Sequence, residues 1–124
     1  MKRREAREKA LQTLFQLDNN ELTVEAAIEH AIEEKTSSEF FEQLVHGTVE
    51  NLEEIDASIV SKLENWSIDR LAKIERTILR VAAYELLFTP ETPKNVVINE
   101  AVEISKTFGD EKSSKFVNGV LSKY

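Results

Sequence analysis

Residues 71–88, LAKIERTILRVAAYELLF, decide the fold class of this sequence. Apolar side chains recur in this stretch at steps of three and four residues, the spacing that places them on one face of an α-helix. Ser67 can cap the start of this helix. Its end should fall near Phe88, because proline cannot continue a helix and Pro90 and Pro93 follow. The apolar face consists of Leu71, Ile74, Ile78, Ala82 and Leu86.

The same period continues on both sides of this stretch and predicts helices over most of the chain. Thr23 and Asp110 stand where the N-caps of two helices are expected, and Gly109 stands at a C-cap. The stretch from Thr36 to Glu39, TSSE, has capping-box spacing and should open a long helix. The strand-like residues 96–98 are too short and isolated to form a sheet. We therefore expect an all-α fold of six to seven helices, at about residues 2–17, 24–32, 39–63, 68–88, 95–108 and 110–121.

Length and composition suit one water-soluble domain over residues 1–124. A chain of 124 residues with 41% hydrophobic content can build one core, whereas two independent domains would be small for that length. No run of about 20 apolar residues could cross a membrane, and no apolar run follows the charged N-terminus as in a secretory signal. The absence of cysteine excludes disulfides, thiolate zinc sites and a cysteine nucleophile. We expect a cytoplasmic protein without membrane association.

The charge of the chain is unevenly distributed. The net charge is −7, yet residues 1–9 hold five basic side chains against two acidic ones, which gives +3 there and leaves −10 for the rest. A basic segment on an acidic body suggests a localised anionic partner. The alternative is a solvated helix start without a partner.

The first predicted helix places basic and apolar side chains on one face. Arg3, Arg7, Leu11 and Leu14 share that face by spacing. Because arginine is rarely buried without a partner, we expect the first two turns to overhang the core with their guanidinium groups projecting, which suits phosphate contacts. The alternative is a set of surface ion pairs, such as Arg4 with Glu8.

No motif in the sequence points to catalysis, a metal or a cofactor. His30 and His46 fall on different predicted helices without metal-site spacing, no glycine-rich phosphate loop is present, and the carboxylates are scattered. Gly119 stands inside a predicted helix, where glycine is costly, so we expect another helix or a partner to approach closely there. We predict a protein that is not an enzyme.

Three motifs in register resemble the NusB family over essentially the whole chain. Residues 75–86, ERTILRVAAYEL, are similar to the family's ER-x-ILR-x-A-x-YEL stretch, and the segments VINEAVE, KTFG and KFVNGVL follow it at residues 97–103, 106–109 and 115–121. Residues 6–8 and 10–15, ARE and ALQTLF, resemble the family's arginine-rich opening helix.

The resemblance implies a NusB-like domain of two packed helical bundles, here at about residues 1–65 and 66–124. It also implies transcription antitermination: binding boxA RNA together with the ribosomal protein NusE, and joining NusA, NusG and RNA polymerase on ribosomal RNA operons. Some ribosomal RNA cytosine methyltransferases carry the same helical domain. Because this chain has no room for their cofactor-binding domain, we do not expect methyl transfer.

The resemblance also implies roles for individual residues. The RNA-binding start corresponds to Lys2, Arg3, Arg4 and Arg7, and aromatic positions near the RNA path correspond to Phe108 and Phe116, beside the basic residues Lys112 and Lys115. Core packing is the alternative for both phenylalanines. The surface that meets NusE corresponds to Phe15 and Glu75. Glu5 interrupts the basic run, and Lys112 replaces an acidic residue of some relatives, so RNA preference can differ from theirs.

Two further arrangements remain open at this point. The chain could be an adaptor that binds only proteins, with its basic helix docked on an acidic partner. A homodimer could also cover the face that RNA and NusE would use.

Overall fold

The computed structural model describes residues 1–18, 22–33, 37–64 and 66–124. These residues form seven α-helices and one short 3₁₀ helix, without a strand, so the predicted all-α fold is confirmed. None of the described helices is long and apolar enough to cross a membrane. The elements are α1 (Arg3–Leu17), α2 (Val24–Ile32), α3 (Glu39–Glu50), α4 (Leu52–Lys62), η1 (Ile68–Arg70), α5 (Lys73–Phe88), α6 (Lys94–Phe108) and α7 (Glu111–Leu121).

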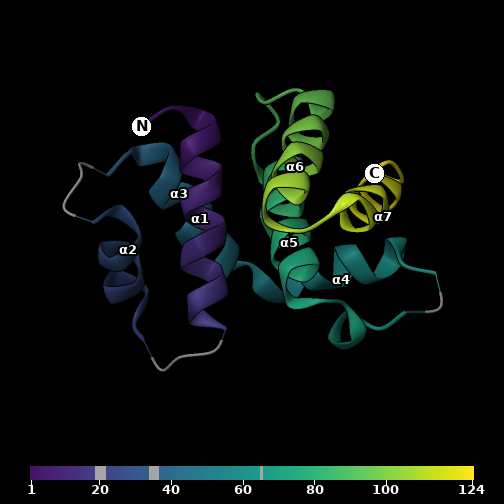
Figure 1. Cartoon of the computed structure of the whole chain (residues 1–124), viewed down its shortest axis with the longest axis horizontal. Helices are drawn as coiled ribbons and strands as arrows, with labels where there is room; N and C mark the ends of the chain where they lie inside the picture. Colours follow the sequence, from purple (N-terminus) through teal and green to yellow (C-terminus); the bar gives the residue numbers. More distant parts are fainter. Residues whose placement is uncertain (19–21, 34–36, 65) are drawn as a thin grey trace.

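The helices form two groups that lie side by side (Figure 1). In one group α1 packs against α2 and α3, and in the other α6 packs against α5 and α7. α5 joins the groups, because it also contacts α1 and α3. One continuous cluster of buried apolar side chains includes residues from all seven α-helices, which supports a single domain. α4 packs mainly on α5, so the contacts favour a division of the two groups near Asn51 rather than near residue 65.

The helix starts follow the predicted caps in part. The side chains of Thr23, Ser38 and Asp110 accept hydrogen bonds from backbone N–H groups in the first turns of α2, α3 and α7. The cap of α3 is thus Ser38, and Thr36 of the expected capping box lies outside the described residues. Ser67 was expected to cap α5, but it precedes η1 without a side-chain bond, and α5 begins only at Lys73.

The long helix expected over residues 39–63 is interrupted. It is divided into α3 and α4 at Asn51, whose backbone angles of −117° and 22° are not helical. The Asn51 side chain donates a 2.8 Å hydrogen bond to the carbonyl oxygen of Gly47. Asparagine competes in this way for backbone groups, and the apolar period, which runs on through the break, does not reveal it.

Two helical glycines have opposite surroundings. A Cβ atom built on Gly119 would have no heavy atom within 4 Å, so the expected close approach of another helix is wrong. The close contact is at Gly47, where such an atom would lie 2.3 Å from the ring of Tyr84. Gly47 therefore lets α3 and α5 pack tightly, whereas Gly119 faces open space.

Candidate nucleic-acid interface

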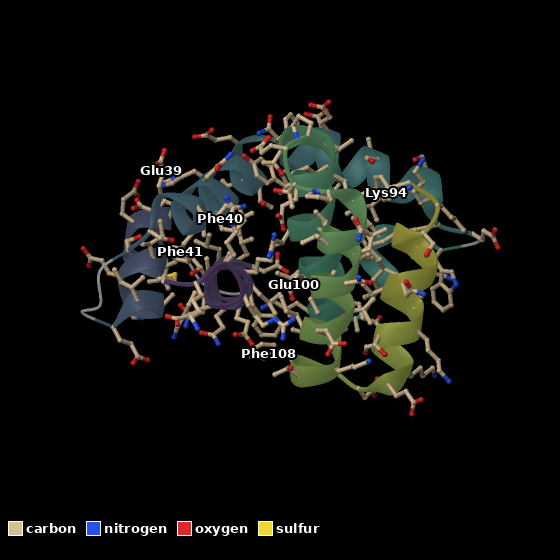
Figure 2. All side chains as sticks on the ribbon, turned by 90° about the horizontal axis from the view of Figure 1, so that it is seen from above. Glu39, Phe40, Phe41, Lys94, Glu100 and Phe108 are labelled. Carbon is tan, nitrogen blue, oxygen red and sulfur yellow. The ribbon has the colours of Figure 1, made fainter. Side chains whose placement is uncertain are left out.

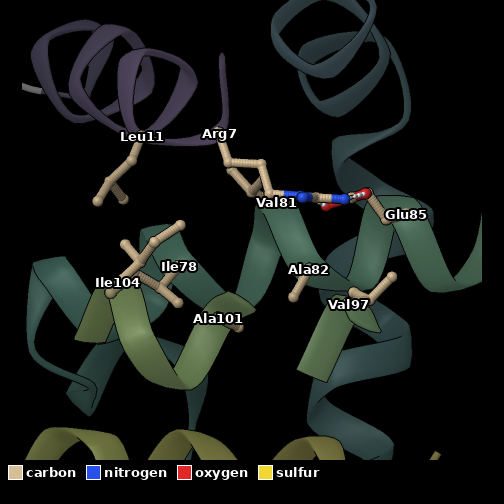
Figure 3. A pocket seen from close by; sticks show the side chains of 9 residues that line it. All are labelled: Arg7, Leu11, Ile78, Val81, Ala82, Glu85, Val97, Ala101 and Ile104. Carbon is tan, nitrogen blue, oxygen red and sulfur yellow. Dashed lines mark hydrogen bonds and ion pairs between the residues drawn. The ribbon is translucent and has the colours of Figure 1, made fainter. Parts of the chain in front are cut away.

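Arg7 is held in a buried ion pair at the junction of the two helix groups. Its Nε and Nη2 atoms donate hydrogen bonds of 2.9 and 2.8 Å to the two carboxylate oxygens of Glu85, on α5. Only 4% of the Arg7 side chain and 2% of the Glu85 side chain are exposed. Figure 3 shows the pair beside a small cavity of about 20 Å³ lined largely by apolar side chains.

This burial corrects one prediction from the sequence. Arg7 was expected to project from the first helix toward a phosphate, but its guanidinium is already satisfied by a carboxylate inside the protein. The pair is bidentate, the arrangement that best matches the planar guanidinium. Its position between α1 and α5 assigns Arg7 to the attachment of α1 rather than to the surface.

The cations that do reach solvent are Lys2, Arg3 and Arg4, all exposed at the start of α1. The Arg3 guanidinium carbon lies 4.1 Å from the ring centroid of Phe40, on α3, within the range of a cation–π contact. Figure 2 looks along α1 and shows Phe40 and Glu100 on different sides of this helix. The contact with α3 thus helps to orient the first turn of α1.

Arg4 is paired with a residue that the sequence did not suggest. It donates a 2.8 Å hydrogen bond from Nε to the Glu100 carboxylate, on α6, instead of pairing with Glu8. This hydrogen bond and the charge of Glu100 raise the pKa of the Arg4 guanidinium above its ordinary value. The Glu100 carboxylate also lies 3.7 Å from Nη1 of Arg7. Glu100 therefore lies between the exposed Arg4 and the buried pair of Arg7 and Glu85.

Phe15 and Phe108, assigned separately to NusE and RNA, lie on the same groove. This groove of about 400 Å³ lies between α1, α5 and α6. Phe108 is 37% exposed, and Figure 2 shows it at the end of α6 beside α1. Phe15 is half-buried, with the Lys73 ammonium 4.0 Å from its ring centroid. The groove is lined by Leu11, Gln12, Phe15, Gln16, Ile74 and Phe108.

Phe116 lines a second groove, so the two predicted RNA-path aromatics are not brought together. This groove of about 270 Å³ lies between α7 and the segment that follows α4. Lys112 and Lys115 are exposed on the first turns of α7, with Lys115 3.8 Å from Glu111. Glu75, the other predicted NusE contact, is half-buried in the first turn of α5.

We compared the sequence and the fold of this chain with those of known proteins. The NusB family matches this chain over residues 4–124. The chain belongs to the NusB family. A transcription antitermination protein NusB from Lysinibacillus sphaericus (strain C3-41) is 65% identical over 124 residues, which cover 100% of this chain and 97% of that protein.

Solved NusB structures share the fold. T. maritima NusB has a TM-score of 0.89 and 38% identity, covering 99% of this chain and 89% of that chain. A crystal structure of the antitermination factors NusB and NusE in complex with dsRNA gives a TM-score of 0.87 at 36% identity, over 98% of this chain and 93% of that one. The family and fold expected from the sequence motifs are therefore confirmed.

Within this NusB fold, the arginines of α1 contact Phe40, Glu85 and Glu100, and the sequence alone did not predict these partners. One signal was available for Glu85, which stands between Tyr84 and Leu86 in an otherwise apolar run and therefore had to be paired. Glu100 and Phe40 carry no comparable signal, because each sits on a helix face whose neighbours depend on the tertiary packing.

Proposed function

We propose that this chain is a transcription antitermination factor that binds boxA RNA together with NusE and supports transcription of ribosomal RNA operons. The observation that carries the proposal is the likeness, over 98% of the chain, to a solved complex of NusB and NusE with dsRNA. The 65% identical relative, itself a transcription antitermination protein, supports the same role.

The surface charge supports RNA as a direct ligand. Lys2, Arg3 and Arg4 present three cations at one end of a rigid helix on a protein with a net charge of −7. Phosphate groups are the anions that such a cluster holds, and a second set of lysines, Lys112 and Lys115, lies on α7. We propose that the RNA backbone contacts both sets.

The aromatic side chains supply the second part of the interface. Phe108 is exposed enough to contact an unpaired base, and Phe116 is half-buried with its groove open to solvent. We propose that Phe15 and Glu75 contact NusE. Because Phe15 and Phe108 share one groove, the NusE and RNA surfaces would adjoin there. Arg7 is proposed to hold α1 in position rather than to touch RNA.

The wider assignments follow from this role. We propose that the complex with RNA and NusE joins NusA, NusG and RNA polymerase in the cytoplasm, and that the protein acts by binding rather than by catalysis. A homodimer would cover part of the same surface in the free protein, and sedimentation with and without RNA tests it.

A second candidate, an adaptor that binds only proteins, is favoured by one observation. The Arg4 guanidinium is already bound by Glu100, so an acidic side chain of a partner could take that place as readily as a phosphate. In this case NusE would bind and RNA would not.

Fluorescence anisotropy of a labelled boxA single strand, against a scrambled strand, separates these functions when measured with and without NusE. A preference for boxA that grows when NusE is added supports antitermination. The absence of RNA binding under both conditions, with NusE still bound, leaves the adaptor.

A further inference from the structure

The groove beside Phe116 contains the most exposed large apolar side chain of the described residues. Trp66 is 53% exposed. It follows α4, whose end lies beside α7 (Figure 1). Because an exposed tryptophan gains little for folding from this position, its ring is available to a ligand.

Lysines surround the two aromatic rings. Lys62, Lys115 and Lys123 line the groove together with Trp66 and Phe116, and its one acidic side chain is Glu64. Glu64 lies 3.1 Å from the Lys123 ammonium, and the Lys62 ammonium lies 5.1 Å from the ring centroid of Tyr124. Glu111 lies 3.8 Å from the Lys115 ammonium, so three ammonium groups face two carboxylates, and the groove has a small excess of positive charge on an acidic protein.

Gly119 keeps the groove open. It lines the groove from α7, and a Cβ atom there would meet no heavy atom within 4 Å. Glycine inside a helix costs stability relative to alanine. Since no other helix approaches Gly119, the packing of the protein does not require glycine at this position. The space in front of Gly119 is open and large enough to admit a ligand group.

We propose that the RNA contact extends across this groove, where an unpaired base stacks on Trp66 while the lysines hold the flanking phosphates. Flat aromatic surfaces alternating with ammonium groups form the arrangement that binds single-stranded nucleic acid. The inference rests on the proposed RNA-binding function and extends it: the strand that meets Lys115 on α7 continues to Lys62, Trp66 and Lys123.

Trp66 is the only tryptophan of the chain, so its fluorescence reports on this groove alone. The full-length protein is titrated with a boxA single strand, and anisotropy of a labelled strand is followed in parallel. We expect saturable quenching of the tryptophan emission with the same midpoint as the anisotropy change. Stacking of one base corresponds to roughly 5- to 150-fold in affinity, which is the loss expected for Trp66→Leu. Trp66→Phe should keep most of the binding.

Gly119→Leu provides a test that leaves Trp66 in place. The Cβ position of Gly119 is clear of other atoms, and the rest of a leucine side chain would occupy the groove, so we expect weaker RNA binding with little change in the melting temperature. Leu87→Ala, at an exposed apolar residue of α5 outside the groove, is the matched control and should bind RNA like the wild type.

The two readouts distinguish failure of this inference from failure of the proposed function. RNA binding by anisotropy, with unchanged tryptophan emission and wild-type affinity for Trp66→Leu and Gly119→Leu, would overturn the groove and leave the function. If the anisotropy of the labelled strand does not change, both the groove proposal and the proposed RNA-binding function are wrong. Quenching by a partner protein, with no effect of RNA, would also overturn the proposal and reassign the groove to a peptide.

Discussion

Arg7 and Glu85 join α1 to α5 through two hydrogen bonds of 2.9 and 2.8 Å, in a site where both side chains are almost completely buried. A buried ion pair adds little net stability compared with apolar residues of the same size. Removing either partner, however, leaves the charge of the other buried without compensation. The exposed cations of α1 precede Arg7 by one turn, so their direction depends on this attachment.

The first prediction concerns the loss of one partner of this pair. Arg7→Ala leaves the Glu85 carboxylate buried without its cation, so the free energy of unfolding should fall by about 3–5 kcal/mol. Urea denaturation followed by circular dichroism measures this change. Arg3→Ala, at an exposed position that makes a cation–π contact with Phe40, is the control and should change stability by no more than about 1 kcal/mol. Equal effects of the two substitutions would show that Arg7 is not structural.

The double substitution Arg7→Met with Glu85→Leu should recover most of the stability lost in Arg7→Ala. Replacing a buried ion pair by apolar residues of similar volume is often neutral, because no charge is left without a partner. If urea denaturation shows the double variant to be as unstable as Arg7→Ala, packing rather than charge pairing explains the loss.

The second prediction concerns the carboxylate that occupies Arg4. If Arg4 binds an RNA phosphate, as proposed, Glu100→Gln removes a competing charge, and the affinity for boxA RNA should rise by up to about fivefold for a partly exposed ion pair. Anisotropy at constant ionic strength measures the change. Glu103→Gln is the comparison: it removes an exposed charge of the same helix that acts on Arg4 through space without a hydrogen bond, so it should raise the affinity less than Glu100→Gln. Weaker binding of Glu100→Gln would contradict competition.

The third prediction concerns the NusE surface. Glu75 is half-buried in the first turn of α5, and we have proposed that it contacts NusE. Glu75→Lys reverses its charge, so NusE binding should weaken while the helical content stays unchanged. Isothermal titration calorimetry and circular dichroism measure the two quantities on one sample. A loss of helical signal would mean that Glu75 is a structural residue and that the NusE assignment is wrong.

The fourth prediction concerns the contact between α3 and α5. Gly47→Ala brings a methyl group against the Tyr84 ring, which is itself buried and stacked on Phe88 with centroids 5.4 Å apart. Since that ring cannot move freely, we expect a loss of about 1–3 kcal/mol in the free energy of unfolding. Gly119→Ala should be neutral or stabilising, because its methyl group meets no atom and alanine favours helix. The reverse order of the two melting temperatures would contradict this packing.

The sequence predicts the helices well because their signal is local. The period of apolar residues and the capping side chains Thr23 and Asp110 lie within a few positions of the helix that they define. The break between α3 and α4 at Asn51 was not predicted, because the apolar period of the region continues through it. Local pattern therefore determines the fold class and most helix ends.

The candidate site was predictable only in part, since its geometry depends on contacts between distant residues. Arg7 and Glu85 are separated by 78 positions, so the sequence gives no reason to join them, and Arg7 was expected at the surface. Phe108 and Phe116 are close in the sequence, yet they line different grooves because α6 and α7 present them to different neighbours. The cations that reach solvent, Lys2, Arg3 and Arg4, were anticipated.

The most direct test of the central claim, that the start of α1 binds RNA phosphates, is the salt dependence of boxA binding. Wild-type protein and the double variant Arg3→Gln, Arg4→Gln are titrated at several salt concentrations. Each phosphate contact on a single strand contributes a slope of about 0.7 in log affinity against log salt, so the double variant should have a slope shallower by about 1.4. Identical slopes and affinities for the two proteins would contradict the claim.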